Sequence, residues 1–243
     1  LKLAVEWGYI DKPSARVSLL PGERRRERVL SVKEEGDYLE AARLVGDSLN
    51  AAYERALTGI RATQREEVPR KPQDPYILLH VAAVLLDCAL RPEECYRLEW
   101  SHVRDGNLYI PFGKTANARR TVPLSKRAAS LLDIRRSSIS GPWVFPAATK
   151  SGHLEQSTLR KQHAKACKLA GLERVPFYTF RHTCLTRWAA HIDPYTLAYF
   201  AGHSDFGTTR RYVHPDLEAA RKSMAKAREE QGGHRIGHSG ADH

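Results

Sequence analysis

Residues 76–100 read "YILLHVAAVLLDCALRPEECYRLEW", and this stretch decides the fold class more than any other part of the chain. Its first part, residues 76–90, is predominantly apolar, which is typical of a helix buried inside a globular protein. The run is too short to cross a bilayer, and it contains His80 and Asp87. Pro92 disfavours helical geometry at Arg91 and suits the first turn of a new helix. Arg91 is therefore predicted to lie at the junction of two helices.

The segment that follows, "SHVRDGNLYIPFGKTANARRTVPLS", predicts a small sheet. Asp105 and Gly106 form a turn signal, and residues 108–112 and 121–124 are rich in residues that favour strands. A polar loop joins these two runs. We expect a three-stranded antiparallel sheet with Lys114 at the end of a hairpin.

Helical patterns fill most of the remaining sequence. Ser31 is a predicted N-cap with Glu34 as its capping-box partner, and Asp193 is the predicted N-cap of a short helix that stops at Gly202. Residues 51–74 are polar and contain prolines, so an irregular surface excursion is predicted there. Further helices are predicted at residues 125–137, 154–171, 181–192, 204–214 and 216–231. The predicted fold is α+β and mainly α.

The composition favours a polyanionic partner. Lys and Arg total 39 against 28 acidic residues, which gives a formal net charge of +11, and nucleic acid explains such an excess better than a merely solvated surface. The four cysteines show neither a CxxC pair nor zinc-ligand spacing, as expected for reduced core thiols in a cytoplasmic protein. Because the sequence begins with Leu1, we expect a fragment of a longer protein.

Five polar residues fall at the predicted ends of separate elements. They are Arg91, Lys114, Arg181, His203 and Tyr212. Residues that are scattered in sequence but placed at element ends are typical of an active site that is assembled by folding.

Each of these residues also has a purely structural explanation. The arginines could be buried partners of Glu94 or Asp205, and the lysine could be a solvated hairpin tip. The histidine could cap the helix that Gly202 ends, and the tyrosine could simply pack its ring. Isolated matches of this kind are often fortuitous, whereas the set taken together favours a functional site.

Four segments that carry these residues resemble the tyrosine recombinases of the phage integrase family. They are "ALRPEECYRLEW", "FGKTANARRTVPLS", "FYTFRHTCLTRWAA" and "AGHSDFGTTRRYVHPD". Their order and flanks agree over residues 30 to about 228, which is most of the chain. One such segment alone would be a weak signal, but four in order are specific.

The resemblance implies a role for each residue of the set. Tyr212 would be the nucleophile, Arg91 and Arg181 would clamp the scissile phosphate, Lys114 would be the general acid, His203 would be a second phosphate donor, and Glu94 would orient the site of the first arginine. Tyr178 departs from the family, which usually has histidine three residues before the second arginine. A tyrosine hydroxyl keeps its proton at neutral pH, so Tyr178 is a poor general base but can still position a neighbour by a hydrogen bond.

The resemblance also implies a domain organisation. Residues 1–25 would be the remnant of an N-terminal core-binding domain with its linker, and residues 26–230 would be the catalytic domain. Residues 231–243 are rich in Gly and His, and they are expected to be a flexible tail.

The function implied is site-specific cleavage and rejoining of double-stranded DNA through a 3′-phosphotyrosyl intermediate. Neither a metal ion nor a nucleotide cofactor is expected, and the working unit would be a homo-tetramer on two DNA sites, associated with the nucleoid and with no membrane segment. Two alternatives share the fold: a catalytically impaired DNA-binding protein, which Tyr178 would favour, and an enzyme that resembles type IB topoisomerases. A helix-turn-helix regulator would explain the charge but not the four segments.

Overall fold

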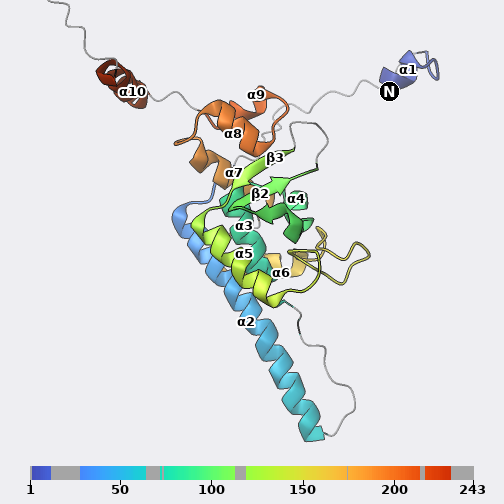
Figure 1. The fold of residues 1–243 in the computed structure, drawn as a ribbon. Helices are drawn as coiled ribbons and strands as arrows, with labels where there is room; N and C mark the ends of the chain where they lie inside the picture. The colour runs from blue at the N-terminus through green and yellow to red at the C-terminus, as the bar shows by residue number, and fades with distance from the viewer. Residues whose placement is uncertain are drawn as a thin grey trace, which may run out of the picture.

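The computed structural model describes residues 2–11, 28–63, 72, 74–112, 119–173, 175–213 and 217–230. Helices dominate this part of the chain, and one three-stranded antiparallel sheet accompanies them, as predicted (Figure 1). The helices are α1 (Lys2–Glu6), α2 (Val32–Thr63), α3 (Ile77–Cys88), α4 (Pro92–Tyr96), the 3₁₀ turn η1 (Trp100–His102), α5 (Lys126–Ser138), α6 (Arg160–Leu169), α7 (Tyr178–Trp188), α8 (Pro194–Ala201), α9 (Phe206–Thr209) and α10 (Leu217–Glu230).

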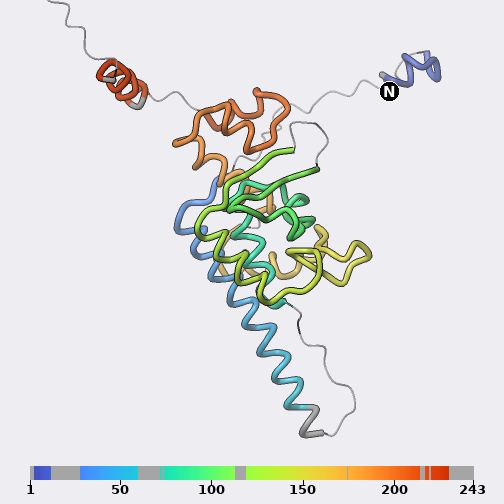
Figure 2. Tube along the Cα trace, in the orientation of Figure 1, coloured from blue at the N-terminus to red at the C-terminus, as the bar shows by residue number. Residues whose placement is uncertain are grey.

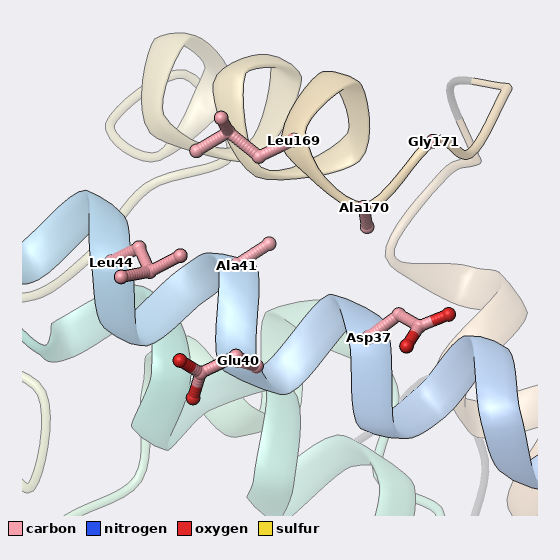
Figure 3. Close-up of a pocket in the computed structure, with 7 residues that line it drawn as sticks. All are labelled: Asp37, Glu40, Ala41, Leu44, Leu169, Ala170 and Gly171. Atoms are coloured by element: carbon pink, nitrogen blue, oxygen red, sulfur yellow. The ribbon is translucent and has the colours of Figure 1, made fainter.

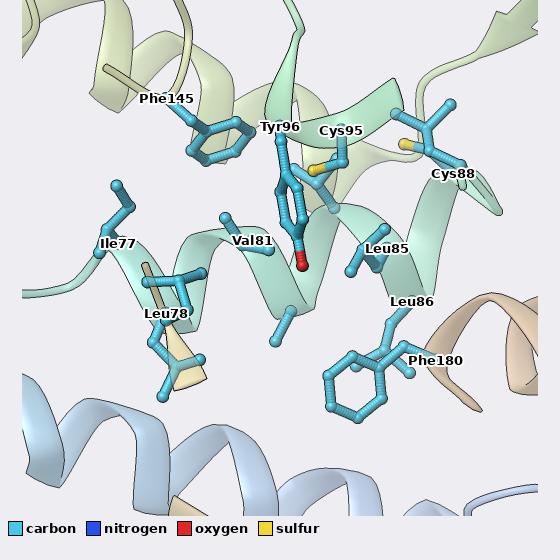
Figure 4. Close-up of a cluster of buried hydrophobic side chains, with 14 of the residues drawn as sticks. Ile77, Leu78, Val81, Leu85, Leu86, Cys88, Cys95, Tyr96, Phe145 and Phe180 are labelled. Atoms are coloured by element: carbon cyan, nitrogen blue, oxygen red, sulfur yellow. The ribbon is translucent and has the colours of Figure 1, made fainter. Parts of the chain in front are cut away.

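Helix α3 forms the centre of the core. It packs against α2, α5 and α7, and nearly all of its side chains are buried. Figure 4 shows Tyr96 and Phe145 on one side of this helix and Phe180 on another. A helix that is apolar all round must be surrounded by other elements, and the buried helix predicted for residues 76–90 is therefore confirmed.

The sheet consists of β1 (Val103–Arg104), β2 (Asn107–Ile110) and β3 (Arg120–Pro123), in the order β1-β2-β3. Asp105 and Gly106 form the first turn with φ of 52° and 70°, as the sequence signal predicts. Strand β3 also contacts α8, which lies beside the sheet (Figure 2). The sheet therefore connects the central core to the helices that follow α7.

The predicted helix caps at Ser31 and Asp193 are present, and Ser125 forms a third. The Ser31 hydroxyl accepts a hydrogen bond from the Glu34 amide at 3.1 Å, and the Glu34 carboxylate accepts one from the Ser31 amide at 2.8 Å. Ser125 caps α5, and Asp193 accepts hydrogen bonds from the first turn of α8. Each cap satisfies amide groups that a helix start leaves without an intrahelical partner.

Four sequence expectations are wrong in their boundaries. Helix α7 covers Tyr178–Trp188 instead of residues 181–192, and α9 covers only Phe206–Thr209 instead of residues 204–214. The irregular excursion expected from residue 51 does not begin there, because α2 runs without a break to Thr63. Residues 51–63 contain several good helix formers and no proline, which allows this extension. Helix α6 begins at Arg160 instead of residue 154, since the Leu154 amide donates to the Phe145 carbonyl at 3.0 Å and residues 156–159 form a turn.

A shallow groove of about 420 Å³ lies between α2 and the end of α6 (Figure 3). Its lining consists of Asp37, Glu40, Ala41, Leu44, Leu169, Ala170 and Gly171. None of the candidate catalytic residues that the structure describes lines this groove. Among the described helices, none is both long enough and apolar enough to span a bilayer.

Candidate active site

The candidate residues gather where several element ends meet. Helix α3 ends at Ala89 in a left-handed conformation with φ of 49°, and this turn leads directly to Arg91 at the N-cap of α4. The start of α7, the end of α8 and strand β3 meet the same region, at one end of the body of the molecule (Figure 1). The helix junction predicted at Arg91 is therefore confirmed, and the ends of other helices and strand β3 surround it.

Arg91 is held by Glu94 and by the end of α8. Its Nη1 donates to Glu94 Oε1 at 2.9 Å, and its Nη2 donates to the Gly202 carbonyl at 2.7 Å. The Arg91 amide also donates to Glu94 Oε2 at 2.8 Å, so the Glu94 carboxylate satisfies the N-cap amide of α4. The Arg91 side chain remains partly exposed, so its guanidinium can face a ligand while Glu94 and the Gly202 carbonyl hold it in place.

Glu94 is buried beneath two arginines. Arg120 Nη1 and Nη2 donate to its two carboxylate oxygens at 3.0 and 2.7 Å. Burial by itself would raise the pKa of Glu94, but the hydrogen bonds and charge of Arg120, together with the Arg91 amide, hold it below its ordinary value. Glu94 is therefore a fixed negative charge between Arg91 and Arg120.

Arg181 is fully buried, with 0% of its surface exposed. It donates from Nη1 to the Ala89 carbonyl at the end of α3 and from Nη2 to the Ala201 carbonyl at 2.6 Å. Burial lowers its pKa, and the charge of Arg91 adds to this effect. The ends of helices α3 and α8 thus bind the same guanidinium. Asp205, which the sequence offered as a possible partner for an arginine, instead caps α9 by accepting from the Gly207 amide at 3.0 Å.

His203 is a neutral imidazole in this arrangement. Burial first, and then the charges of Arg181 and Arg91, lower its pKa to about 4. Its Nε2 lies 3.4 Å from Arg181 Nη2, and its Nδ1 lies 2.8 Å from Thr209 Oγ1. Because a guanidinium can only donate, Nε2 accepts, and Nδ1 carries the proton that is donated to Thr209.

We expect His203 to make the fold less stable at acidic pH. The pKa of about 4 in the fold lies below the ordinary value of 6.5, so between these values the unfolded chain binds a proton that the folded chain does not. This contribution to the free energy of unfolding is complete above pH 6.5 and is lost as the pH falls towards 4.

Chemical unfolding of wild type and His203→Gln at pH 7.5 and pH 4.5 measures this effect. The variant should lose less stability on acidification than wild type does. His80, whose pKa burial also lowers to about 4, keeps its own contribution in both proteins, so the difference isolates His203. Equal losses in the two proteins would contradict a neutral His203.

Tyr212 lies at the edge of a second apolar cluster and is 5% exposed. Its ring stacks on the His203 ring at 6.1 Å and 16°, and it meets the His182 ring at 5.0 Å and 54°. The other buried members of this cluster are Ala89, Cys184, Leu185, Leu197 and Ala201. The tyrosine therefore packs its ring and lies beside the arginine and histidine group at the same time.

Tyr178 is 47% exposed and begins α7. The Arg181 guanidinium carbon lies 5.9 Å from the centroid of its ring, so the residue borders the site from the solvent side. Lys114 lies outside the described residues. The remaining predicted residues, Arg91, Glu94, Arg181, His203 and Tyr212, are brought together.

Sequence reasoning missed three contributors. Arg120 stands inside one of the quoted segments without an assigned role, and Thr209 and His182 contact the ring residues of the site. One signal could have pointed to Arg120: in β3 it shares a face with Val122, so a strand pattern places this arginine on the buried side. Within the described ranges, no group of three or more His, Cys, Asp or Glu side chains could hold a metal ion.

The fold and this arrangement agree with a family comparison. The model of the phage integrase family matches residues 62–219, which is more than half of the chain. The chain belongs to the phage integrase family, the tyrosine recombinases.

Three known proteins illustrate the similarity. The tyrosine recombinase XerD of Brucella suis is 28% identical over 151 residues, which cover 56% of this chain and 48% of that protein. The integrase of the Tn1549 transposon has a TM-score of 0.59 at 17% identity and covers 86% of this chain and 69% of its own. Lambda integrase has a TM-score of 0.59 at 16% identity, with coverages of 88% and 68%. The chain spans about half the length of the curated relatives it matches.

Proposed function

We propose that the chain is the catalytic part of a site-specific recombinase or integrase that cleaves and rejoins double-stranded DNA through a 3′-phosphotyrosyl intermediate. The observation that carries this proposal is the convergence of Arg91, Arg181, His203 and Tyr212 at one meeting point of element ends. The net charge of +11 supports a polyanionic substrate.

The chemistry follows from the residue types. The Tyr212 hydroxyl gives its proton to water as its oxygen attacks the phosphorus, a P–O bond to tyrosine forms, and the bond to the 5′ oxygen breaks. Arg91 and Arg181 bind the charge on the non-bridging oxygens with their planar guanidinium groups. Lys114 gives its proton to the leaving 5′ oxygen. The phosphotyrosine bond conserves the energy of the phosphodiester, so rejoining needs no ATP. The two guanidinium groups would supply the positive charge that a metal ion supplies in other phosphoryl-transfer sites.

His203 can serve as a donor after a change of tautomer. In the described arrangement its Nε2 accepts from Arg181, and Thr209 accepts from Nδ1. A hydroxyl can donate as well as accept, so Thr209 can donate to Nδ1 when a phosphate oxygen takes the hydrogen bond from Nε2–H. Tyr178, at the solvent side of Arg181, is proposed to hydrogen-bond the same phosphate or the Tyr212 oxygen without acting as the general base.

The partners proposed are DNA and further copies of the chain. The structure of the Tn1549 integrase is a complex with circular intermediate DNA, and that of lambda integrase is a dimer bound to a core site. We propose a homo-tetramer on two DNA sites in which α10 passes between neighbours. The exposed apolar residues Leu217 and Met224 of α10 support this role. We also propose the domain division expected from the sequence: an N-terminal remnant (residues 1–25), a catalytic domain (26–230) and a tail (231–243). A location at the nucleoid is proposed as well.

A covalent-trapping experiment tests the function. The full protein is incubated, with EDTA present, with a library of nicked duplexes that prevent rejoining, and protein-linked DNA is recovered and sequenced. We expect a denaturation-resistant adduct on a defined sequence, with the DNA attached through its 3′ phosphate. Binding without any adduct would favour the impaired DNA-binding protein, and adducts without sequence preference would favour the topoisomerase-like enzyme.

A further inference from the structure

We propose that Arg120 is a positioning residue that fixes the spacing of the two phosphate-binding arginines. The proposal rests on the proposed function of Arg91 and Arg181 and adds a residue that does not itself reach the DNA. The Arg120 guanidinium is committed to Glu94 through Nη1 and Nη2 and to the Phe200 carbonyl through Nε, so its effect on a substrate passes through these neighbours.

Arg120 joins two parts of the site that are far apart in sequence. Its Nη1 and Nη2 hold both oxygens of Glu94, and its Nε donates to the Phe200 carbonyl at 2.7 Å. Glu94 in turn holds Arg91. One planar guanidinium therefore fixes the acidic support of Arg91 against the end of α8.

The end of α8 binds three arginines on three consecutive carbonyl groups. Phe200 accepts from Arg120, Ala201 from Arg181 and Gly202 from Arg91. The last carbonyl groups of a helix lack intrahelical partners and carry its partial negative charge. The position of this helix end therefore sets where both phosphate-binding guanidinium groups lie, and Arg120 holds the helix end in place.

Gly202 leaves the space that this arrangement requires. Its φ is +61°, and a Cβ at this position would lie 2.9 Å from Arg120 Nη1. A side chain there would push Arg120 away from Glu94 and would also strain the backbone. The absence of a side chain at Gly202 thus permits the ion pair between Arg120 and Glu94.

The main test is Arg120→Lys, which keeps the charge and removes the planar fork. A lysine ammonium cannot bind both Glu94 oxygens and the Phe200 carbonyl in this geometry. We expect duplex binding to stay within a few-fold of wild type and single-turnover cleavage to fall by about 10- to 100-fold, as misplaced reacting groups do. Arg135→Lys is the matched control, because Arg135 is equally buried and ion-paired to Asp74, away from the site.

A double-variant comparison separates positioning from simple stability. If Arg120 acts through Glu94, Arg120→Met combined with Glu94→Gln should cleave no more slowly than the slower single variant. Gly202→Ala should show the same loss of cleavage with retained binding, and it provides a second variant if Arg120→Lys folds poorly. Wild-type cleavage rates in Arg120→Lys, or losses that multiply in the double variant, would overturn the proposal.

An NMR measurement keeps this test independent of the reaction. The Arg91 and Arg181 Nε–H resonances should shift in Arg120→Lys and stay in place in Arg135→Lys, even without DNA. If wild type forms no adduct, the proposed function fails, while the NMR shifts still decide whether Arg120 positions the two arginines. Unmoved resonances in Arg120→Lys would reject the positioning role whether or not the protein cleaves DNA.

Discussion

Tyr212→Phe should abolish the covalent DNA adduct and leave duplex binding nearly unchanged. The phenylalanine ring can still pack against Leu185, Leu197 and the His203 ring, so the fold should persist. Only the hydroxyl that would attack phosphorus is removed. Binding depends mainly on many phosphate contacts, and the loss of one hydroxyl changes it little.

The adduct is measured on a denaturing gel with nicked duplex, and binding is measured by mobility shift at several salt concentrations. Tyr195→Phe is the matched control, because Tyr195 is a highly exposed tyrosine of α8 outside the ring group of Tyr212. It should form the adduct at the wild-type rate. An adduct in Tyr212→Phe would show that another residue is the nucleophile and that Tyr212 only packs.

Arg181→Lys should have the next largest effect on cleavage. The Arg181 guanidinium binds the Ala89 and Ala201 carbonyl groups at once, and a lysine ammonium has no second branch to bridge them. The positive charge of the lysine would also lie in the wrong position relative to the phosphate. We expect cleavage to fall by roughly 100- to 1,000-fold, which is typical for the loss of one preorganised donor.

The same change should lower the melting temperature, since a buried carbonyl left without its donor costs about 1–3 kcal/mol. Arg187→Lys is the control on the same helix, because Arg187 pairs with Glu35 on the outer side of α7. It should change cleavage by no more than a few-fold. Near-normal cleavage in Arg181→Lys, at a temperature where the variant is folded, would remove Arg181 from the phosphate clamp.

Local signals in the sequence determined much of the architecture. The apolar run before Arg91 predicted the central helix, and Pro92 predicted the helix junction. The caps at Ser31 and Asp193 and the turn at Asp105 also followed from residue type alone. Such features depend on a few neighbouring residues, so they can be read without knowledge of the fold. The four family segments added the set of candidate residues in the same way.

The tertiary structure decided how these residues act on one another. No local pattern shows that Phe200, Ala201 and Gly202 each bind a different arginine, because Arg91, Arg120 and Arg181 come from three separate elements. The neutral state of His203 likewise depends on burial and on charges that folding brings close. Burial, hydrogen-bond direction and pKa are properties of contacts between distant segments, and those contacts exist only once the chain has folded.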